Sequence, residues 1–195
     1  MGFDVSGLNP KYNTTVDDFP MLKKWRTVPW LEREEHKDWE KEQELYWKEH
    51  DDESESNCGV YFRNNVWWWR PLWQYCYEVC EHLLTYEEWQ AGGYNDGHEY
   101  DEEVCLEMAA LLQADIDDGS CQRYKDHYQA ELDALPNEIC SRCNGNNRGH
   151  KKKKDCNPCD GTGETENWSK SYPFDVENVQ RFVNFLKECG GMSIC

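Results

Sequence analysis

Residues 59–73 have the sequence GVYFRNNVWWWRPLW, and this stretch decides which fold the rest of the chain can adopt. It holds four Trp, one Tyr and one Phe, and its charged residues are Arg63 and Arg70. Since one aromatic side chain buries about 150–250 Å², the cluster can anchor a small core or a recognition surface. The aromatic and β-branched bias predicts an extended segment over 61–69, and the proline that follows predicts a helix that starts at 70–72.

The three consecutive tryptophans cannot all point toward one core. In an extended segment Trp67 and Trp69 lie on one face and Trp68 lies on the other, because side chains alternate along a strand. The helices predicted around the stretch have narrow apolar stripes and need a core from elsewhere. We therefore expect one face of the stretch to form that core. The opposite face, with Arg70 at its edge, is where we expect function.

Composition places the chain among folded proteins of one domain, or of one domain with a small appended module. Of its 195 residues 38% are hydrophobic and 14% aromatic, with 10 Trp, so a few large side chains can build the core. It has no run of 18 apolar residues and no signal-peptide pattern, so we expect a soluble, intracellular protein with no membrane partner. An odd number of Cys, 11, favours a reducing compartment over a disulfide scaffold.

The chain is strongly and unevenly acidic. Its net charge is −18, and the acidic excess lies in residues 1–57 and 58–139, whereas residues 140–195 are slightly basic. Such a body disfavours nucleic acid as a partner and suits a basic surface on a partner protein. The basic exception is the run Lys151, Lys152, Lys153 and Lys154. We interpret this run as a solvated loop, with contact to phosphates or to an acidic partner as the alternative.

The sequence pattern predicts a mainly α fold with short strands, in which a helical core surrounds the Trp cluster. Phe3 and Val5 predict a strand within residues 1–10, and residues 192–195 are predicted to form a terminal strand that can pair with it. Helices are predicted over 29–49, 71–84, 101–117 and 120–135. The short connection at Gly119 predicts that the last two of these form an antiparallel hairpin. A final helix begins after Asp175, with one apolar face: Val179, Phe182, Val183 and Leu186.

The predicted organisation is a helical core, residues 1–139 and 172–195, that carries two additions. Residues 27–50 form a charged helical insertion, joined to the core by an acidic, mobile linker over 51–57. Residues 140–171 form a zinc-binding module, a knuckle hairpin inserted before the last helix. His82 and His127 fall on predicted helices, and we interpret them as partly buried structural residues.

Four cysteines have the spacing of a metal site. Cys140, Cys143, Cys156 and Cys159 give the pattern C-x2-C-x12-C-x2-C. Four thiolates satisfy tetrahedral Zn²⁺, and each CxxC turn presents two sulfurs. We therefore predict one structural zinc ion with a closed shell of ligands. Two disulfides or unliganded thiols are the alternatives, and His150 could replace one ligand.

The second Cys pair resembles a known zinc module. Residues 156–163, CNPCDGTG, are similar to the CxxCxGxG repeat of the DnaJ-type zinc finger, and the first pair matches only through CxxCxG because Asn147 stands where the second glycine would be. The likeness covers about 24 residues, without a J-domain or the other two repeats. It implies one metal site and not a co-chaperone function.

A second candidate site combines the Trp stretch with a polar loop over 92–98. Arg63 and Arg70 flank the tryptophans, and an arginine beside Trp67, Trp68 and Trp69 suits stacking or an anionic planar ligand. The loop supplies Tyr94, Asn95 and His98. The alternatives are that the two arginines pair with nearby carboxylates and that the loop is an ordinary turn before a helix.

The order of these segments resembles a family of uncharacterised tailed-bacteriophage proteins. The likeness is carried by MGFDVSGLNP at residues 1–10, by YFRNNVWWWRPLW at 61–73, and by FDVENVQRFVNFLKECGGMSIC at 174–195. It implies a protein found in the cytoplasm of an infected bacterial host. The family has no settled activity, so the resemblance implies a source and no role.

Three hypotheses for function follow. The first is a non-enzymatic phage accessory protein that binds and modulates a host protein, for example a component of a defence system. The absence of GxSxG, P-loop, GxGxxG and HExxH patterns favours it over an enzyme. The second is a nucleotide or small-ligand binding protein or enzyme that uses Arg63, Arg70 and the 92–98 loop. The third is nucleic-acid binding through the zinc module and its four lysines.

Overall fold

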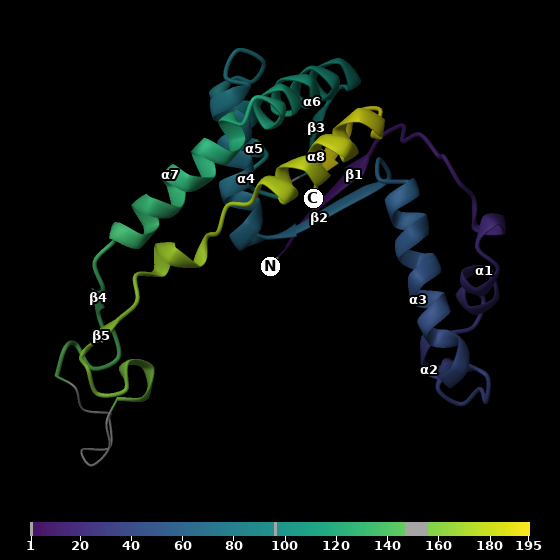
Figure 1. Ribbon diagram of the computed structural model, residues 1–195, viewed down its shortest axis with the longest axis horizontal. Helices are drawn as coiled ribbons and strands as arrows, with labels where there is room; N and C mark the ends of the chain where they lie inside the picture. Colours follow the sequence, from purple (N-terminus) through teal and green to yellow (C-terminus); the bar gives the residue numbers. More distant parts are fainter. Residues whose placement is uncertain (1, 96, 147–155) are drawn as a thin grey trace.

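A computed structural model describes residues 2–95, 97–146 and 156–195 (Figure 1). The described chain is mainly α-helical with short strands, as predicted. Its helices are α1 (Pro20–Arg26), α2 (Trp30–Arg33), α3 (Trp39–Ser56), α4 (Val66–Val79), α5 (Tyr86–Ala91), α6 (Glu102–Asp117), α7 (Ser120–Ala134) and α8 (Val176–Glu188). The strands are β1 (Gly2–Gly7), β2 (Tyr61–Asn65), β3 (His98–Tyr100), β4 (Glu138–Ile139), β5 (Glu164–Thr165) and β6 (Met192–Ile194). Short 3₁₀ turns occur at Val16–Asp18, Asn157–Cys159 and Trp168–Ser171.

The central sheet joins the two ends of the chain. Its strand order is β2-β1-β6-β3, all antiparallel, and Val5 lies opposite both Phe62 and Ile194. The predicted pairing of the terminal strand with the first strand is therefore confirmed. Phe3 and Val5 are buried beneath the helices, whereas Asp4 between them lies on the other face. One face of the sheet thus packs on the core, and the other face is polar.

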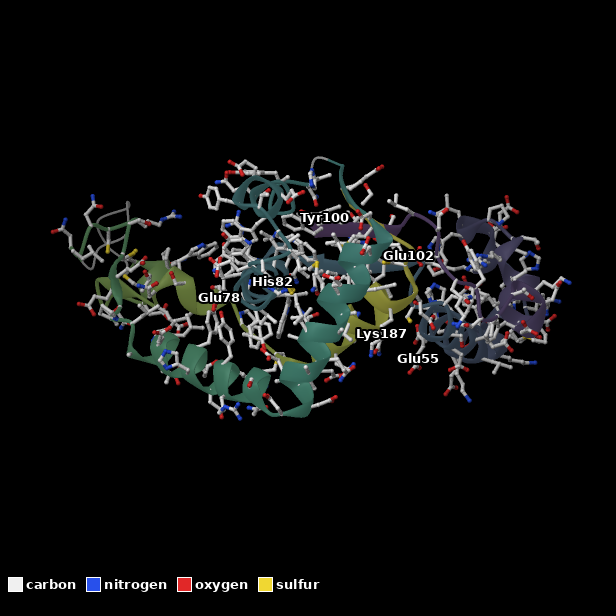
Figure 2. All side chains as sticks on the ribbon, turned by 90° about the horizontal axis from the view of Figure 1, so that it is seen from above. Glu55, Glu78, His82, Tyr100, Glu102 and Lys187 are labelled. Atoms are coloured by element: carbon white, nitrogen blue, oxygen red, sulfur yellow. The ribbon has the colours of Figure 1, made fainter. Side chains whose placement is uncertain are left out.

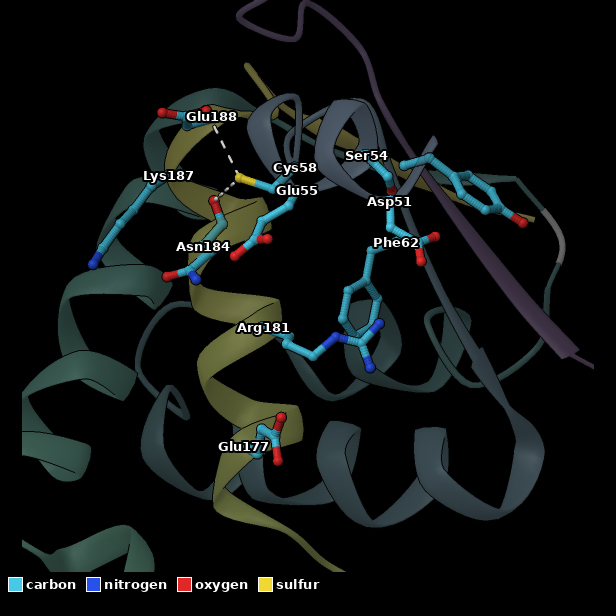
Figure 3. Close-up of a pocket in the computed structure, with 11 residues that line it drawn as sticks. Asp51, Ser54, Glu55, Cys58, Phe62, Glu177, Arg181, Asn184, Lys187 and Glu188 are labelled. Carbon is cyan, nitrogen blue, oxygen red and sulfur yellow. Dashed lines mark hydrogen bonds between the residues drawn. The ribbon is translucent and has the colours of Figure 1, made fainter. Parts of the chain in front are cut away.

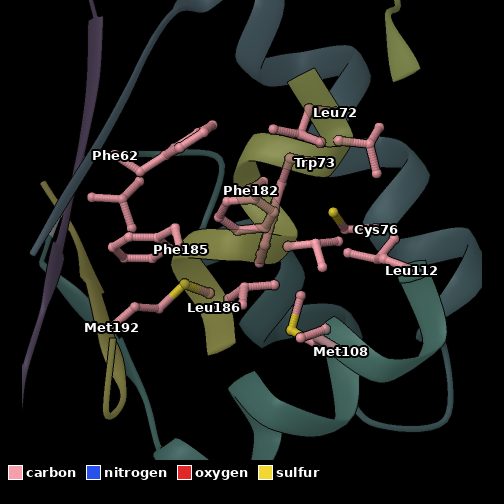
Figure 4. Packing of buried hydrophobic residues seen from close by; sticks show 14 of the residues in the cluster. Phe62, Leu72, Trp73, Cys76, Met108, Leu112, Phe182, Phe185, Leu186 and Met192 are labelled. Atoms are coloured by element: carbon pink, nitrogen blue, oxygen red, sulfur yellow. The ribbon is translucent and has the colours of Figure 1, made fainter. Parts of the chain in front are cut away.

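The core lies between this sheet and helices α4, α6 and α8 (Figure 4). Phe182 and Phe185 of α8 stack on each other, and both rings contact Phe62 of β2, at 5.1 and 5.9 Å. The predicted apolar face of α8 is buried as expected. The tryptophans reach this core from α4, where Trp69 and Trp73 are buried. The prediction of a helical core around a Trp cluster is confirmed.

The prediction that residues 61–69 are extended throughout is wrong, because α4 begins at Val66. The side chain of Asn65 caps the helix by accepting hydrogen bonds from the N–H groups of Trp67 (3.0 Å) and Trp68 (3.2 Å). Pro71 therefore lies inside the helix instead of starting it. The helix also stops at Val79, earlier than predicted. The capping asparagine outweighs the β-preference of the aromatic residues that follow it.

The three tryptophans consequently diverge around a helix and do not alternate across a strand. Trp69 faces the core, while Trp67 and Trp68 are half-buried. The Trp67 ring packs against Trp168 and Tyr172, at 4.7 and 4.9 Å between ring centroids. Through these contacts, Trp67 holds residues 168–172, which follow the Cys pairs in the chain, against the first turn of α4.

Helices α1, α2 and α3 form an arm that extends from one side of the core (Figure 1). The arm has a small core of its own, made of Leu22, Trp25, Trp39 and Tyr46. The single helix predicted over 29–49 is interrupted after Arg33, and the predicted acidic linker is helical, since α3 continues to Ser56. The acidic residues explain this. Glu49, just before the predicted linker, accepts from the N–H groups of Met21 (2.7 Å) and Leu22 (2.9 Å) at the start of α1. Glu53, inside the linker, accepts from Arg26 of α1 at 3.0 Å, which holds this part of α3 against α1.

The predicted helices over 101–117 and 120–135 match α6 and α7. The prediction that these two helices form an antiparallel hairpin is wrong. Figure 2 shows α7 leaving α6 at a corner. The turn between them has Gly119 in the left-handed region, with φ 78°. Tyr124 and Tyr128 of α7 pack on Phe174, at 4.8 and 6.1 Å, and α6 packs along α8. Each helix therefore covers a different part of the core.

The arm should lose stability in acid through Glu42. Hydrogen bonds from Lys24 and from the Trp25 indole lower the pKa of this carboxyl. The contribution of the Glu42 carboxylate to folding stability is therefore complete above the usual glutamate pKa of about 4.3. It is lost as the pH falls through the lower pKa of the folded state. We expect Glu42→Gln to destabilise the arm at pH 7 and to have progressively less effect toward pH 3. Urea unfolding followed by fluorescence measures this; a constant difference across that range would contradict it. The exposed Glu44→Gln is the control.

Candidate metal centre

The two CxxC pairs come together at the far end of the molecule from the arm (Figure 1). Cys140, Cys143, Cys156 and Cys159 are all buried, and their Sγ atoms all lie within 4.8 Å of one another. The Sγ atoms of Cys140 and Cys156 are 3.8 Å apart, and those of Cys143 and Cys159 are 3.7 Å apart. These separations are too long for the S–S bond of a disulfide, about 2.05 Å.

Two of the sulfur separations match the edge of a metal-centred tetrahedron. Four sulfurs placed about 2.3 Å from a central ion lie about 3.8 Å from one another. The two separations across the Cys pairs agree with this edge length. The four cysteines therefore form a group that could hold a metal ion, as the spacing of the sequence predicted.

Both Cys turns have the same backbone shape. After the first pair, Asn144 and Gly145 have φ of 49° and 75°, and after the second pair, Asp160 and Gly161 have φ of 45° and 78°. Each is an Asx residue followed by glycine in the left-handed region, which those residue types tolerate best. The glycines that follow each Cys pair in the sequence are thus required by the turn.

Backbone hydrogen bonds hold the two turns against each other. The N–H of Cys140 donates to the carbonyl of Gly163 at 2.9 Å, next to the paired strands β4 and β5. The N–H of Gly163 donates to Sγ of Cys159 at 3.4 Å. Burial alone would raise the pKa of Cys159, but this N–H and the neighbouring thiols lower it to about 7. Burial, and then hydrogen bonds with the other thiols, raises the pKa of Cys156 to about 12.

His150 and the basic run Lys151, Lys152, Lys153 and Lys154 lie outside the described residues. The hypothesis of nucleic-acid binding through these lysines stays a prediction.

The two other histidines considered above are described, and the prediction that they are partly buried is wrong. His82 is exposed in the turn after α4, and His127 is exposed and lies 3.2 Å from Glu131.

The predicted ligand-binding residues divide into two groups. Arg63 lies on the polar face of the sheet, 3.5 Å from Asp4, and so matches the alternative of a carboxylate pair. The Asn95 side chain donates to the carbonyl of Gly2 at 2.7 Å, and His98 stands on β3 with its ring against Tyr100. These three side chains do not share a cavity in the described structure.

Arg70 and Tyr94 do come together. With Trp69 they line a cavity of about 300 Å³ between α4 and the end of α5. Arg70 does not pair with a carboxylate among the described residues; it donates to the Tyr172 hydroxyl at 3.1 Å. The cavity's other side chains, Trp73, Gln74, Trp89 and Gln90, were not predicted as site residues.

A larger groove of about 560 Å³ lies between the end of the arm and α8 (Figure 3). Asp51 and Glu55 line it from α3, and Arg181 reaches across it over the Phe62 ring, at 5.7 Å. Cys58 donates to the Asn184 carbonyl at 3.5 Å, and burial raises the pKa of its thiol. The sequence held no signal for this groove, because its two walls are more than a hundred residues apart.

Comparison with family models, with curated proteins and with solved structures finds no match to this chain. Within the described residues, no helix has both the length and the apolar character needed to cross a membrane.

Proposed function

We propose that this chain is a non-enzymatic bacteriophage accessory protein that binds and modulates a host protein, and that its four cysteines hold one structural zinc ion. Zinc is the metal that four thiolates in a tetrahedron suit best. With four protein ligands the shell is closed, whereas a catalytic zinc keeps one position for water. The proposed ion therefore stabilises the module and does not take part in a reaction.

Exposed apolar side chains on the arm carry the proposal of a protein partner. Leu31 is 87% exposed, Trp30 53% and Trp47 43%, although the arm has its own buried core. The rings of Trp30 and Trp47 lie 5.9 Å apart, so they form one patch. Exposed aromatic residues in such a patch are typical of interfaces between proteins.

The surroundings of this patch indicate the chemistry of the partner. Helix α3 carries many more acidic than basic side chains, and the chain as a whole has a net charge of −18. A partner with an apolar centre and a basic rim would complement it. That the partner is a host protein, met in the cytoplasm of an infected cell, draws its support from the resemblance of residues 1–10, 61–73 and 174–195 to phage proteins.

Affinity capture from a bacterial lysate tests this proposal. We expect the wild-type protein to retain a basic protein that the double variant Trp30→Ser, Trp47→Ser does not retain, and we expect added salt to weaken the capture. Tyr12→Ser removes an exposed ring outside the patch, 67% exposed, and is the matched control. Circular dichroism of each variant verifies the fold. If the double variant and the wild type retain the same proteins, the patch is not the binding surface.

A further inference from the structure

We propose that the cavity between α4 and α5 binds a planar nitrogen heterocycle that carries an anionic group, of the nucleoside monophosphate class. The cavity volume, about 300 Å³, lies at the lower end of the range for small-ligand sites, about 300–1,000 Å³. This size suits one mononucleotide and not a polymer. The site shares no residue with the patch on the arm, so it is independent of the partner-binding proposal.

The floor of the cavity is rigid. The indoles of Trp69 and Trp73 stack with their ring centroids 5.3 Å apart and their planes 11° apart. Each indole N–H donates to a backbone carbonyl, Trp69 to Gly92 at 3.0 Å and Trp73 to Trp89 at 2.8 Å. A Cβ at Gly92 would lie 2.5 Å from the Trp73 ring, so only glycine permits this close contact. A site fixed before the ligand arrives loses little entropy on binding.

One ring at the mouth of the cavity is free to stack on a ligand. The faces of Trp69 are covered by Phe3 and Trp73, and Trp89 packs on Tyr77 and Tyr86. Tyr94, in contrast, is exposed and makes no ring contact within the described residues. Stacking of a base on an aromatic ring is worth about 1–3 kcal/mol and accepts any planar heterocycle.

The polarity of the cavity favours an anion. Among the described residues, Arg70 is the charged residue of its lining and no carboxylate lines it, although the chain has a net charge of −18. Its Nη1 donates to Tyr172, which holds the guanidinium in place, and its other N–H donors make no hydrogen bond within the described parts of the chain. A guanidinium presents a planar fork of donors that matches phosphate or carboxylate oxygens.

Two amides supply acceptors for the edge of a heterocycle. The Gln74 amide nitrogen donates to Glu78 at 3.0 Å, and the Gln90 amide nitrogen donates to the Tyr86 hydroxyl at 3.0 Å. Both side-chain oxygens are left without a hydrogen bond among the described residues. A ring with exocyclic N–H donors, such as adenine, complements two acceptor oxygens.

Isothermal titration of the full chain with AMP, UMP, adenosine and ribose 5-phosphate tests the site. We expect AMP to bind most tightly. UMP, which has no exocyclic amine, and the two fragments should each bind at least about tenfold more weakly, since each loses one group of contacts. Arg70→Gln should weaken AMP binding about 10- to 100-fold, the effect of losing a charged hydrogen bond, and Arg70→Lys should restore part of it. Gln90→Leu should weaken AMP and leave ribose 5-phosphate unchanged.

The matched control is Arg63→Gln, which removes the same charge at a position outside the cavity. Thermal unfolding without ligand establishes that each variant is folded. The proposal is overturned if AMP does not bind at concentrations of about 1 mM, a generous limit for a weak site. It is also overturned if Arg63→Gln and Arg70→Gln weaken AMP equally, because the loss would then reflect net charge alone.

Discussion

Replacing Trp69 by alanine is expected to lower the free energy of unfolding by about 3–5 kcal/mol, the usual cost of truncating a buried large aromatic residue. The side chain is fully buried, with 0% exposure. It stacks between Phe3 and Trp73, both at 5.3 Å, and meets the Phe182 ring edge-on at 5.7 Å. Since small domains are stable by about 5–15 kcal/mol, the variant should lose a large share of its stability.

Urea unfolding followed by circular dichroism measures this loss. Trp68→Ala is the matched control, because Trp68 is the same residue type on the same helix but is only half-buried. Its expected loss is about 1 kcal/mol, the centre of the range for point variants. Equal losses for the two variants would contradict the assignment of Trp69 to the core and of Trp68 to its margin.

The second large effect concerns the four cysteines. We expect wild-type protein to hold one zinc per chain and Cys156→Ser to hold none after dialysis, because structural zinc sites contribute about 10–16 kcal/mol of binding free energy. Cys156 is buried in the cluster, and Cys195, which is exposed, gives the control Cys195→Ser. Elemental analysis by mass spectrometry measures the stoichiometry. Less than one zinc per chain in wild-type protein with four free thiols would refute the site.

Hydrogen exchange shows how far the effect of zinc loss spreads. We expect the amides of Ile139, in strand β4, and of Cys140, which follows it, to exchange rapidly in Cys156→Ser. The amides of α8 should keep their protection, because that helix is buried against the sheet and α6. Loss of protection in α8 as well would mean that the module and the core unfold together.

The features that the sequence predicted well are those set by local pattern. The C-x2-C spacing and the glycines after it define the turns that gather Cys140, Cys143, Cys156 and Cys159. The apolar spacing of α8, from Val179 to Leu186, locates its buried face. In both cases the residues that define the feature are neighbours in the chain, so the pattern holds the needed information.

The features that were missed depend on side chains that act across the chain or against local preference. Asn65 starts α4 inside a stretch with strong β-preference, and Glu49 and Glu53 hold an acidic segment of α3 against α1. The cavity required Trp89 and Gln90 of α5 to lie beside α4, which no local pattern reveals. Arg63 and Arg70 both flank the tryptophans, so the sequence does not distinguish them. Their surroundings differ because the chain changes from strand β2 to helix α4 between them.

The position of β6 in the sheet determines the order in which the chain can fold during synthesis. It bridges β1 and β3, and Val5 pairs with Ile194 across almost the whole sequence. The contacts within the arm are local and can form early, but the sheet stays incomplete until residues 192–194 leave the ribosome. Such distant pairing slows folding. Until translation reaches β6, the nascent chain exposes its tryptophan-rich core to other chains, and this is when it is most prone to aggregate.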